Sequence, residues 1–422
     1  MNELSGILAF IKRYQQQGVN FFWYSFQTIG TMLLSAIIFF VAAKLLTPEV
    51  FGKYNYLLAL VSFFVLFGNF GLSASVSKYV AEYKVKDEKK INSIVFSSLL
   101  ICLILCLLII VFIVLFGRIL FKENYKYFKY IIPLIFLIAS VNIFDGFYRG
   151  LKEFKKLSIV SIISGLTTLC GIFFLIKYFY LIGAILSQIL YYGLFFILLF
   201  IFIPKRHSSF DKEISIQVFT YSMVIGVSGI SYFLYTRADI LILEYFGYVV
   251  EIGYYEIINK LFRLLYIPFA ILGLVIAPDI TRLMAEHKYH KLRYYFNKLY
   301  YVFFIGILMS ILTYLFFPQV MRLMLSEYLS ESFLKILNIL LILLPFKVAG
   351  TLLTNGFIVP SGFANIIAYL TIIGGIVNIV LDFVFIKYYG FIGVFYVTVL
   401  VHGIADILTF VIYGIVFRKR HL

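Results

Sequence analysis

Charge is scarce in this chain. Asp, Glu, Lys and Arg make up 13% of its 422 residues, and hydrophobic residues make up 63%, whereas a soluble domain carries roughly 25% charged residues. A water-soluble fold has no means of burying so much apolar surface, so lipid must solvate most of it. The composition therefore excludes an ordinary soluble domain and predicts a protein that lies largely within a membrane.

The residue types and motifs that carry chemistry are also missing. The three cysteines all lie inside apolar stretches (Cys102, Cys106 and Cys170), which is typical of small buried residues rather than of disulfide partners or metal ligands. The sequence has no Gly-x-x-x-x-Gly-Lys-Ser/Thr loop, which excludes ATP hydrolysis by this chain. It also has no Ser/His/Asp or Cys/His arrangement of useful spacing. We predict a protein that is not an enzyme and uses no cofactor or metal.

Long hydrophobic runs fill the sequence instead. A helix needs roughly 20 apolar residues to cross the hydrocarbon core of a bilayer, and twelve stretches of the chain satisfy this length. We place them at residues 21–45, 52–77, 93–117, 127–149, 157–178, 180–203, 216–246, 251–277, 295–317, 332–356, 364–387 and 390–416. The junctions near 179 and 389 are predicted to be tight hairpins. The predicted fold class is all-α, a polytopic membrane protein with twelve transmembrane helices.

Basic residues indicate how these helices are oriented. Lys and Arg are more than twice as frequent in one alternating set of connections as in the other, and cytoplasmic connections carry such an excess. Both termini are therefore predicted to be cytoplasmic. The net charge of +16 reflects these topology signals, so no nucleic acid is predicted as a partner. Residues 1–19 lack the apolar core of a signal peptide and are predicted to form an amphipathic helix along the inner face.

The second half of the chain repeats landmarks of the first. Phe51-Gly52-Lys53-Tyr54 is followed by Ala81-Glu82-Tyr83-Lys84, and about 200 residues later Ile252-Gly253-Tyr254-Tyr255 is followed by Ala285-Glu286-His287-Lys288. Similarly, Ile176-Lys177-Tyr178 with Ile182-Gly183 returns as Ile386-Lys387-Tyr388 with Ile392-Gly393. Because each half has an even number of spans, the halves form a parallel repeat, which is common in transporters. We predict an N-terminal six-helix lobe at 1–207 and a C-terminal six-helix lobe at 208–422.

Short motifs near the second and fourth spans carry a family resemblance. They are Leu46-Thr47-Pro48-Glu49-Val50-Phe51-Gly52-Lys53-Tyr54, Gly71-Leu72, Ser77-Lys78, Ala81-Glu82-Tyr83 and Asp145-Gly146-Phe147-Tyr148-Arg149-Gly150. Together with the span count and the repeat, these motifs resemble the Wzx-type polysaccharide flippases of the multidrug/oligosaccharidyl-lipid/polysaccharide (MOP) exporter superfamily. Twelve spans argue against the peptidoglycan-precursor branch, which typically has fourteen.

The resemblance implies two helical lobes in a V shape, as in the multidrug branch, with a cavity between them. It also implies that the chain carries a polyprenyl-diphosphate-linked oligosaccharide across the cell membrane by alternating access. The implied partners are this lipid-linked oligosaccharide, membrane lipids, and the glycosyltransferases and polymerase of polysaccharide synthesis.

Ionisable residues inside the spans are the candidate functional residues, because each costs at least about 2.5–3.5 kcal/mol at the bilayer centre. The seventh and eighth spans hold the richest cluster, with Arg237, Asp239 and Glu244 on one and Glu256, Lys260 and Arg263 on the other. We predict that the three cations bind the diphosphate, whose negative charges suit guanidinium and ammonium donors. Asp239 and Glu256 are then the acids of the cavity. The alternative is an ion-pair network within the hairpin, in which Glu256 pairs with Lys260 or Arg237.

Four further ionisable residues lie in the last three spans. Lys347 follows Pro345, which favours a bend, and is a further candidate diphosphate ligand unless its amine extends to the membrane surface. Asp382, His402 and Asp406 are candidates for proton or cation coupling, since imidazole titrates near neutral pH. His402 and Asp406 lie four residues apart and share a helix face. A structural hydrogen bond between helices is the alternative.

Asp145 and Arg149 are the ionisable pair of the first half. They lie four residues apart at the inner end of the fourth span. This spacing is compatible with two interpretations, a local ion pair and a gate.

Two rival functions remain at this point. A cation or drug antiporter of the same fold, coupled to protons or sodium, requires an anionic cavity, and the surplus of Arg and Lys in the second half argues against it. A membrane-embedded glycosyltransferase or polymerase usually needs a sizeable loop with catalytic acids, and the connections here are short.

Overall fold

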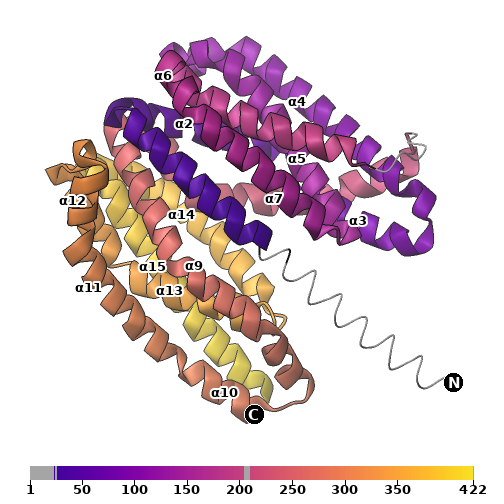
Figure 1. The fold of residues 1–422 in the computed structure, drawn as a ribbon. Helices are drawn as coiled ribbons and strands as arrows, with labels where there is room; N and C mark the ends of the chain where they lie inside the picture. The colour runs from indigo at the N-terminus through magenta and orange to yellow at the C-terminus, as the bar shows by residue number, and fades with distance from the viewer. Residues whose placement is uncertain (1–22, 24–25, 204–209, 422) are drawn as a thin grey trace. The chain divides into compact units, whose positions relative to one another are not determined.

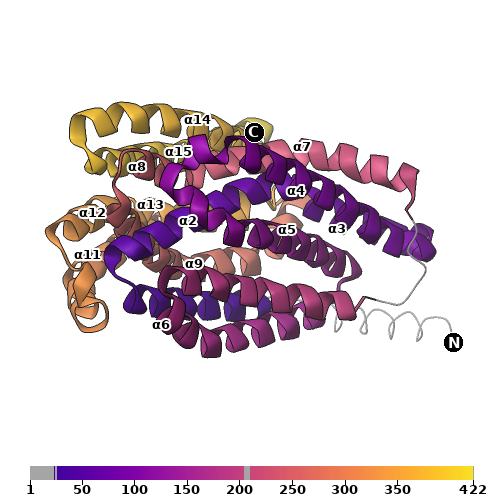
Figure 2. The same cartoon turned by 90° about the horizontal axis from the view of Figure 1, so that it is seen from above.

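The computed structural model describes Trp23, residues 26–203 and residues 210–421, with side chains described up to residue 415. The predicted amphipathic segment 1–19, the start of the first span and the predicted lobe boundary at 207–208 lie outside this part. Within it every regular element is a helix (Figures 1 and 2). After a first helix at Phe26–Leu45, the chain forms α2(Pro48–Asn69), α3(Leu72–Lys86), η1(Glu88–Lys90), α4(Ile91–Phe121), η2(Lys122–Tyr127), α5(Phe128–Leu151), α6(Phe154–Ile201), α7(Lys212–Thr236), α8(Ala238–Tyr245), α9(Val249–Ala285), α10(Tyr289–Asn297), α11(Leu299–Met324), η3(Ser326–Tyr328), α12(Glu331–Leu341), α13(Leu344–Leu353), η4(Thr354–Ile358), α14(Ala364–Tyr389) and α15(Phe391–His421).

The length and composition of these helices confirm a multi-span membrane protein. Nine helices of the described part are long and apolar enough to cross a bilayer, and a bent pair, Glu331–Leu341 with Leu344–Ile358, adds a tenth candidate. Side chains such as Leu108, Val114 and Leu115 on α4 are 61–63% exposed, which requires lipid around them. The predicted all-helical membrane fold is therefore confirmed.

Two of the nine helices are too long for a single crossing. Glu88–Leu151 has 64 residues and Phe154–Ile201 has 48. At about 1.5 Å per residue they would measure about 96 and 72 Å, against about 30 Å of hydrocarbon. The first contains η2 between α4 and α5, and the second reverses at Tyr180, where φ is 51° and ψ is −121°. The described helices are thus compatible with the predicted twelve spans.

The two hairpins predicted near residues 179 and 389 have similar geometry. The chain turns at Tyr180 in the first half and at Gly390, with φ of 61°, in the second. In each turn a glycine three residues later packs against the backbone of the preceding helix, Gly183 against Leu175 and Gly393 against Phe385. A side chain at either glycine would collide with a carbonyl oxygen. The repeated Ile-Gly motif therefore provides room for the tight turn.

A second pair of repeat landmarks lies face to face. The first turns of α2 and α9 meet at Gly52 and Gly253. A Cβ atom added to Gly253 would lie 3.0 Å from the Pro48 carbonyl oxygen and 3.3 Å from the Gly52 nitrogen. The neighbouring aromatic residues of both landmarks, Phe51 and Tyr254, contact the ring of Tyr328, with centroids 5.8 and 6.3 Å apart. The repeated Gly-aromatic motif thus allows two helix starts to approach closely.

The chain divides into two compact units. Unit 1 comprises residues 1–46 and 60–229, and unit 2 comprises 47–59 and 230–422. In unit 1, α3 and α6 pack on α5, and in unit 2, α14 packs on α15 and α13 packs on α9 and α11. One border lies just before α2, and the other two lie inside α2 and α7, so each of these two helices belongs partly to both units. The six-span lobes derived from the sequence repeat, 1–207 and 208–422, stay a prediction.

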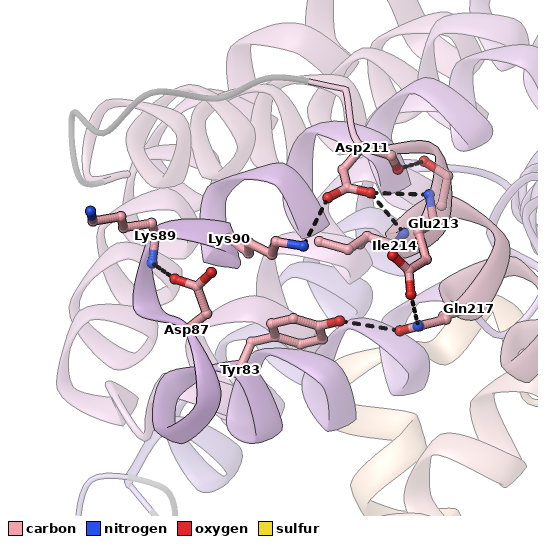
Figure 3. A network of polar contacts seen from close by, with 9 residues as sticks. Tyr83, Asp87, Lys89, Lys90, Asp211, Glu213, Ile214 and Gln217 are labelled. Atoms are coloured by element: carbon pink, nitrogen blue, oxygen red, sulfur yellow. Dashed lines mark hydrogen bonds and ion pairs between the residues drawn. The ribbon is translucent and has the colours of Figure 1, made fainter.

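The first half of α7 is held to α3 and η1 by polar contacts in unit 1 (Figure 3). Asp211 begins the helix, because its Oδ1 accepts hydrogen bonds from the backbone N–H groups of Glu213 and Ile214 at 3.0 and 3.1 Å. Its other carboxylate oxygen lies 3.4 Å from the Lys90 amine. Tyr83 donates to Gln217 at 3.3 Å. These contacts fix the start of the helix that leads into unit 2.

Three predicted spans are interrupted where hydropathy alone predicts continuous helices. The second ends at Asn69, because Phe70 and Gly71 have left-handed φ angles of 30° and 80°. The seventh ends at Thr236, and α8 begins after the non-helical Arg237 (φ −139°, ψ −14°). The tenth bends by 43° between Leu341 and Leu344. Pro345 starts the helix after this bend, where its missing N–H has no helical partner to lose.

Candidate functional site

Asp239 is the centre of a buried polar cluster in unit 2. It lies in the first turn of α8 and is 1% exposed. Its Oδ1 accepts a hydrogen bond of 2.6 Å from the Asn378 side chain. Its Oδ2 accepts bonds from the Tyr255 hydroxyl at 2.8 Å and the Thr398 hydroxyl at 3.1 Å. Asp239 therefore has only uncharged partners here and is not the acid of a cationic pair.

A second carboxylate completes this cluster. Asp382 lies one turn after Asn378 on α14, and both are fully buried. The Asn378 amide donates to Asp382 Oδ2 at 3.1 Å as well as to Asp239. Asp382 Oδ1 and Asn378 Oδ1 have no hydrogen-bond partner among the described residues. Buried oxygens without a hydrogen-bond partner, close to a second carboxylate, cost free energy unless a proton or cation is bound.

The donor atoms of this acid cluster decide what it can hold. We define it as Asp239, Tyr255, Asn378, Asp382 and Thr398, from α8, α9, α14 and α15. All of its potential ligand atoms are oxygens, which suit a proton or a hard cation and not a soft transition metal. No group of three or more His, Cys, Asp or Glu side chains suited to a metal ion occurs in the described residues.

The predicted diphosphate ligands form a second cluster beside the first. Arg237 lies 3.2 Å from Glu256, and their side chains are 39% and 12% exposed. Lys260 is one turn further along α9 and within electrostatic reach of Arg263, Glu256 and Arg237. Arg263 is exposed and makes no ion pair with a described residue. Lys260 therefore has two cations and one acid, Glu256, within electrostatic reach. The ion pair of Arg237 and Glu256, which the alternative interpretation predicts, is formed.

Lys347 and Asp406 form another ion pair of unit 2. Their charged atoms are 3.2 Å apart, and the side chains are 22% and 17% exposed. His402 lies one turn before Asp406 but bonds elsewhere, because its Nε2 is 3.0 Å from the Tyr235 carbonyl oxygen. Its ring stacks on that of Tyr235 with centroids 4.0 Å apart. His402 and Asp406 thus share a helix face, as predicted, but have different partners.

The ionisable pair of the first half is local. Arg149 and Asp145 form an ion pair along α5, with side chains 46% and 17% exposed. This agrees with the structural alternative, while a role as a gate stays a prediction.

Three members of the acid cluster were missed by sequence reasoning: Tyr255, Asn378 and Thr398. All are uncharged, so a search for ionisable residues within spans passes over them. Asn378 and Asp382 lie four residues apart, and this spacing of two polar residues on one face of an apolar helix was the available signal. Thr398 and Tyr255 gave none, because single hydroxyl residues are ordinary in membrane helices.

Known structures share this arrangement of helices. An inward-facing multidrug resistance MATE family transporter of the MOP superfamily matches with a TM-score of 0.76 and 17% identity, over 92% of this chain and 95% of that one. The lipid II flippase MurJ in an inward closed conformation matches with a TM-score of 0.73 and 17% identity, over 93% of this chain and 87% of that one. These similarities show that this chain shares its fold with both of these membrane proteins.

Sequence comparison identifies the family. A model described as polysaccharide biosynthesis protein matches residues 18–284, and a MatE model matches residues 224–384. The chain belongs to the polysaccharide biosynthesis protein family, within the MOP superfamily. It is also 24% identical over 380 residues to the uncharacterized membrane protein MJ1375 of Methanocaldococcus jannaschii, which covers 85% of this chain and 89% of that protein. The family resemblance predicted from the sequence motifs is confirmed.

Proposed function

We propose that this transporter is a flippase that moves a polyprenyl-diphosphate-linked oligosaccharide across the cytoplasmic membrane by alternating access. Its termini would be cytoplasmic, in accord with the distribution of basic residues. The lipid-linked oligosaccharide would come from membrane glycosyltransferases on the inner side and pass to a polymerase on the outer side. Family membership supports the connection with polysaccharide synthesis.

The surplus of cations around Glu256 is the observation that carries the proposal. Lys260 lies within electrostatic reach of Arg237, Arg263 and Glu256, and Arg237 pairs with Glu256. Confining like charges within a membrane protein is costly unless an anion is bound for part of the cycle. A diphosphate supplies about two negative charges and several acceptor oxygens, which match these donors. Lys347 would add a fourth cation whenever its contact with Asp406 is broken.

The acid cluster would supply the coupling. Arg237 and Asp239 flank the start of α8, and Tyr255 and Glu256 are neighbours on α9. Asp239 and Tyr255 belong to the acid cluster, whereas Arg237 and Glu256 form an ion pair with each other. Binding of a proton or sodium ion between Asp239 and Asp382 would therefore shift the short segment that carries Arg237. Diphosphate binding and cation binding would affect each other through this segment.

A cation or drug antiporter is the second candidate. The MatE match and the similarity to a multidrug transporter favour it. A cationic substrate would require acids at its binding surface, whereas the carboxylates of the acid cluster, Asp239 and Asp382, are buried. The cation surplus therefore favours an anionic substrate.

Vesicle reconstitution tests the proposal. A fluorescent polyprenyl-diphosphate sugar is incorporated, and its transfer between leaflets is measured as loss of accessibility to an external quencher. Removing Arg237 alone would leave Glu256 largely buried without its partner, so Arg237→Gln is combined with Glu256→Gln. We expect this variant and Lys260→Gln to flip the substrate about tenfold more slowly, since a hydrogen bond to a charged group contributes about 1.5–3 kcal/mol.

The matched control is Lys86→Gln with Lys156→Gln, two exposed cations that form ion pairs on their own surface segments. It should flip at the normal rate. Normal flipping by the Arg237/Glu256 and Lys260 variants, in folded protein, would refute the proposed binding site. Dye efflux by the wild-type chain without any flipping would instead support the antiporter.

A further inference from the structure

The connection between α9 and α11 forms a short amphipathic helix on the surface of unit 2. His287 has a left-handed φ of 55°, which turns the chain after α9, and α10 follows from Tyr289 to Asn297. Leu292 and Leu299 are buried, and Tyr289 and Phe296 are partly buried. Leu292, Leu299, Tyr289 and Phe296 pack against one hydrophobic core with Leu353, Phe357 and Tyr413. The face that bears Leu292 therefore fixes α10 to the body of the unit.

The opposite face of α10 is basic and aromatic. We call the α10 surface the exposed set His290, Lys291, Arg293, Tyr294, Tyr295 and Lys298. Tyr294 and Tyr295 are 57% and 48% exposed, and the Lys298 amine lies 4.3 Å from the centre of the Tyr294 ring. No acid of the described residues forms an ion pair with Lys291, Arg293 or Lys298. Glu286 pairs with Lys288 at 2.6 Å and also lies within electrostatic reach of Lys291. The surface therefore keeps a net positive charge.

The position of α10 along the membrane normal follows from helix length. α11 has 26 residues, about 39 Å of helix, which already exceeds the hydrocarbon thickness of about 30 Å. α10 precedes it and is much more polar, so it lies at the level of the lipid headgroups. Tyrosines concentrate at that level because their rings are amphipathic.

The corresponding connection of the first half provides a contrast. The landmark Ala81-Glu82-Tyr83-Lys84 is the counterpart of Ala285-Glu286-His287-Lys288, but it leads into the three-residue η1 instead of a helix like α10. Most of the lysines in this first-half connection contact other groups of the protein. Lys84 donates to the Leu151 carbonyl at 3.0 Å, Lys86 pairs with Glu82 at 2.6 Å, and Lys90 contacts Asp211 (Figure 3). Basic residues of the first half thus hold helices together, whereas those of α10 face outward.

We infer that the α10 surface binds the headgroups of anionic phospholipids in the membrane leaflet that contains it. Lys291, Arg293 and Lys298 contact the phosphate groups, and Tyr294 and Tyr295 lie among the headgroups. Electrostatic complementarity favours an anionic lipid surface over a neutral one, since each cation near an anionic membrane strengthens binding by about fivefold. The buried face with Leu292 and Phe296 keeps the helix parallel to the membrane. This surface is separate from the Arg237 cluster, so its role does not depend on the proposed substrate.

Native mass spectrometry of the full chain in neutral detergent tests the inference with phosphatidylglycerol and phosphatidylcholine as probes. We expect wild-type protein to retain phosphatidylglycerol preferentially. Lys291→Gln/Arg293→Gln/Lys298→Gln should lower its affinity for that lipid by about fivefold per removed cation. The matched control is Lys86→Gln/Lys156→Gln/Lys335→Gln, which removes the same charge from residues that are ion-paired on their own segments.

Equal losses in both triple variants, or none in the α10 variant, would overturn the inference. A second measurement does not depend on the folding of any variant. Phosphatidylglycerol should slow backbone hydrogen exchange of residues 289–298 in the wild-type chain, and phosphatidylcholine should not. Unchanged exchange would count against the surface. Stronger protection by a polyglutamate peptide than by the lipid would indicate an acidic protein partner and equally contradict the inference.

Discussion

Asp239 and Asp382 share one amide. The Asn378 side chain donates to both carboxylates, which holds two acids near one another without a cation between them. Charged side chains buried in this way repel each other, so one proton or one cation strongly stabilises the pair. In the proposed coupling, the unpartnered Oδ1 atoms of Asp382 and Asn378 would be the remaining ligands. At the scale of single residues, the acid cluster is thus better suited to exchange a cation than to stabilise the fold.

Replacement of Asp382 by Asn should uncouple transport from its driving ion. The amide keeps the size of the side chain but removes one negative charge, so affinity for a cation should fall by at least about tenfold. Flipping is measured in vesicles under imposed sodium gradients and under imposed pH gradients, and the gradient that accelerates the wild-type chain identifies the ion. Asp279→Asn, at an exposed acid paired with Arg282, is the control and should keep the full response. A normal gradient response of Asp382→Asn would exclude the cluster as the coupling site.

The elements of the fold were predictable where local sequence determines them. The hairpins near residues 179 and 389 are predicted because consecutive apolar spans meet there with almost no connection, and the chain turns at Tyr180 and Gly390. Gly183 and Gly393 leave room for the two helices to touch at these turns. The break at Arg237 was not predictable from hydropathy, which has no information on backbone angles. The contact of Asn378 with Asp239 joins residues 139 positions apart. Such contacts depend on helix packing, and two of the three uncharged residues involved had no distinguishing sequence pattern.

The start of α7 should respond to acid through Asp211. Hydrogen bonding from the Ile214 N–H, assisted by the Lys90 amine, holds the pKa of this carboxyl below its ordinary value of 3.8. A group whose pKa is lowered on folding stabilises the fold above its unfolded pKa, and this contribution is lost as pH falls through the folded pKa. We therefore expect the first turn of α7 to open more readily as pH falls below this ordinary value.

Hydrogen exchange of the Glu213 and Ile214 amides measures this effect, with Asp211→Asn compared with the wild-type chain at each pH. Asparagine also begins helices well and does not titrate. In Asp211→Asn the exchange of these amides should therefore change with pH only as the intrinsic exchange rate does. Asp211→Ala should weaken the turn at every pH, by about 1 kcal/mol. Identical pH profiles for wild type and Asp211→Asn would show that the carboxylate does not stabilise the turn.

At the scale of the whole molecule, α2 and α7 connect the two compact units within single helices. The border falls between residues 59 and 60 in α2 and between 229 and 230 in α7. Any motion of one unit against the other must therefore bend these helices or strain them. α7 carries Gly229 at its border, where a Cβ atom would meet only the Leu66 side chain at 3.7 Å. Glycine lowers the cost of bending a helix because it contributes least to helix stability.

Gly229→Ala should accordingly slow flipping without weakening substrate binding. Alanine stabilises a helix by about 1 kcal/mol relative to glycine. If each transport cycle bends α7 at this position, the rate should fall by about fivefold. Gly193→Ala is the matched control, because Gly193 lies in α6 within unit 1 and its Cβ atom would meet only Leu137, at 3.9 Å. Flipping rate and equilibrium binding of the fluorescent lipid-linked sugar are measured for both variants. Equal rates for the two variants would mean that α7 moves as a rigid rod. The flexible element of the transport cycle would then lie elsewhere, and the helix breaks at Gly71 and Arg237 would be the next positions to substitute.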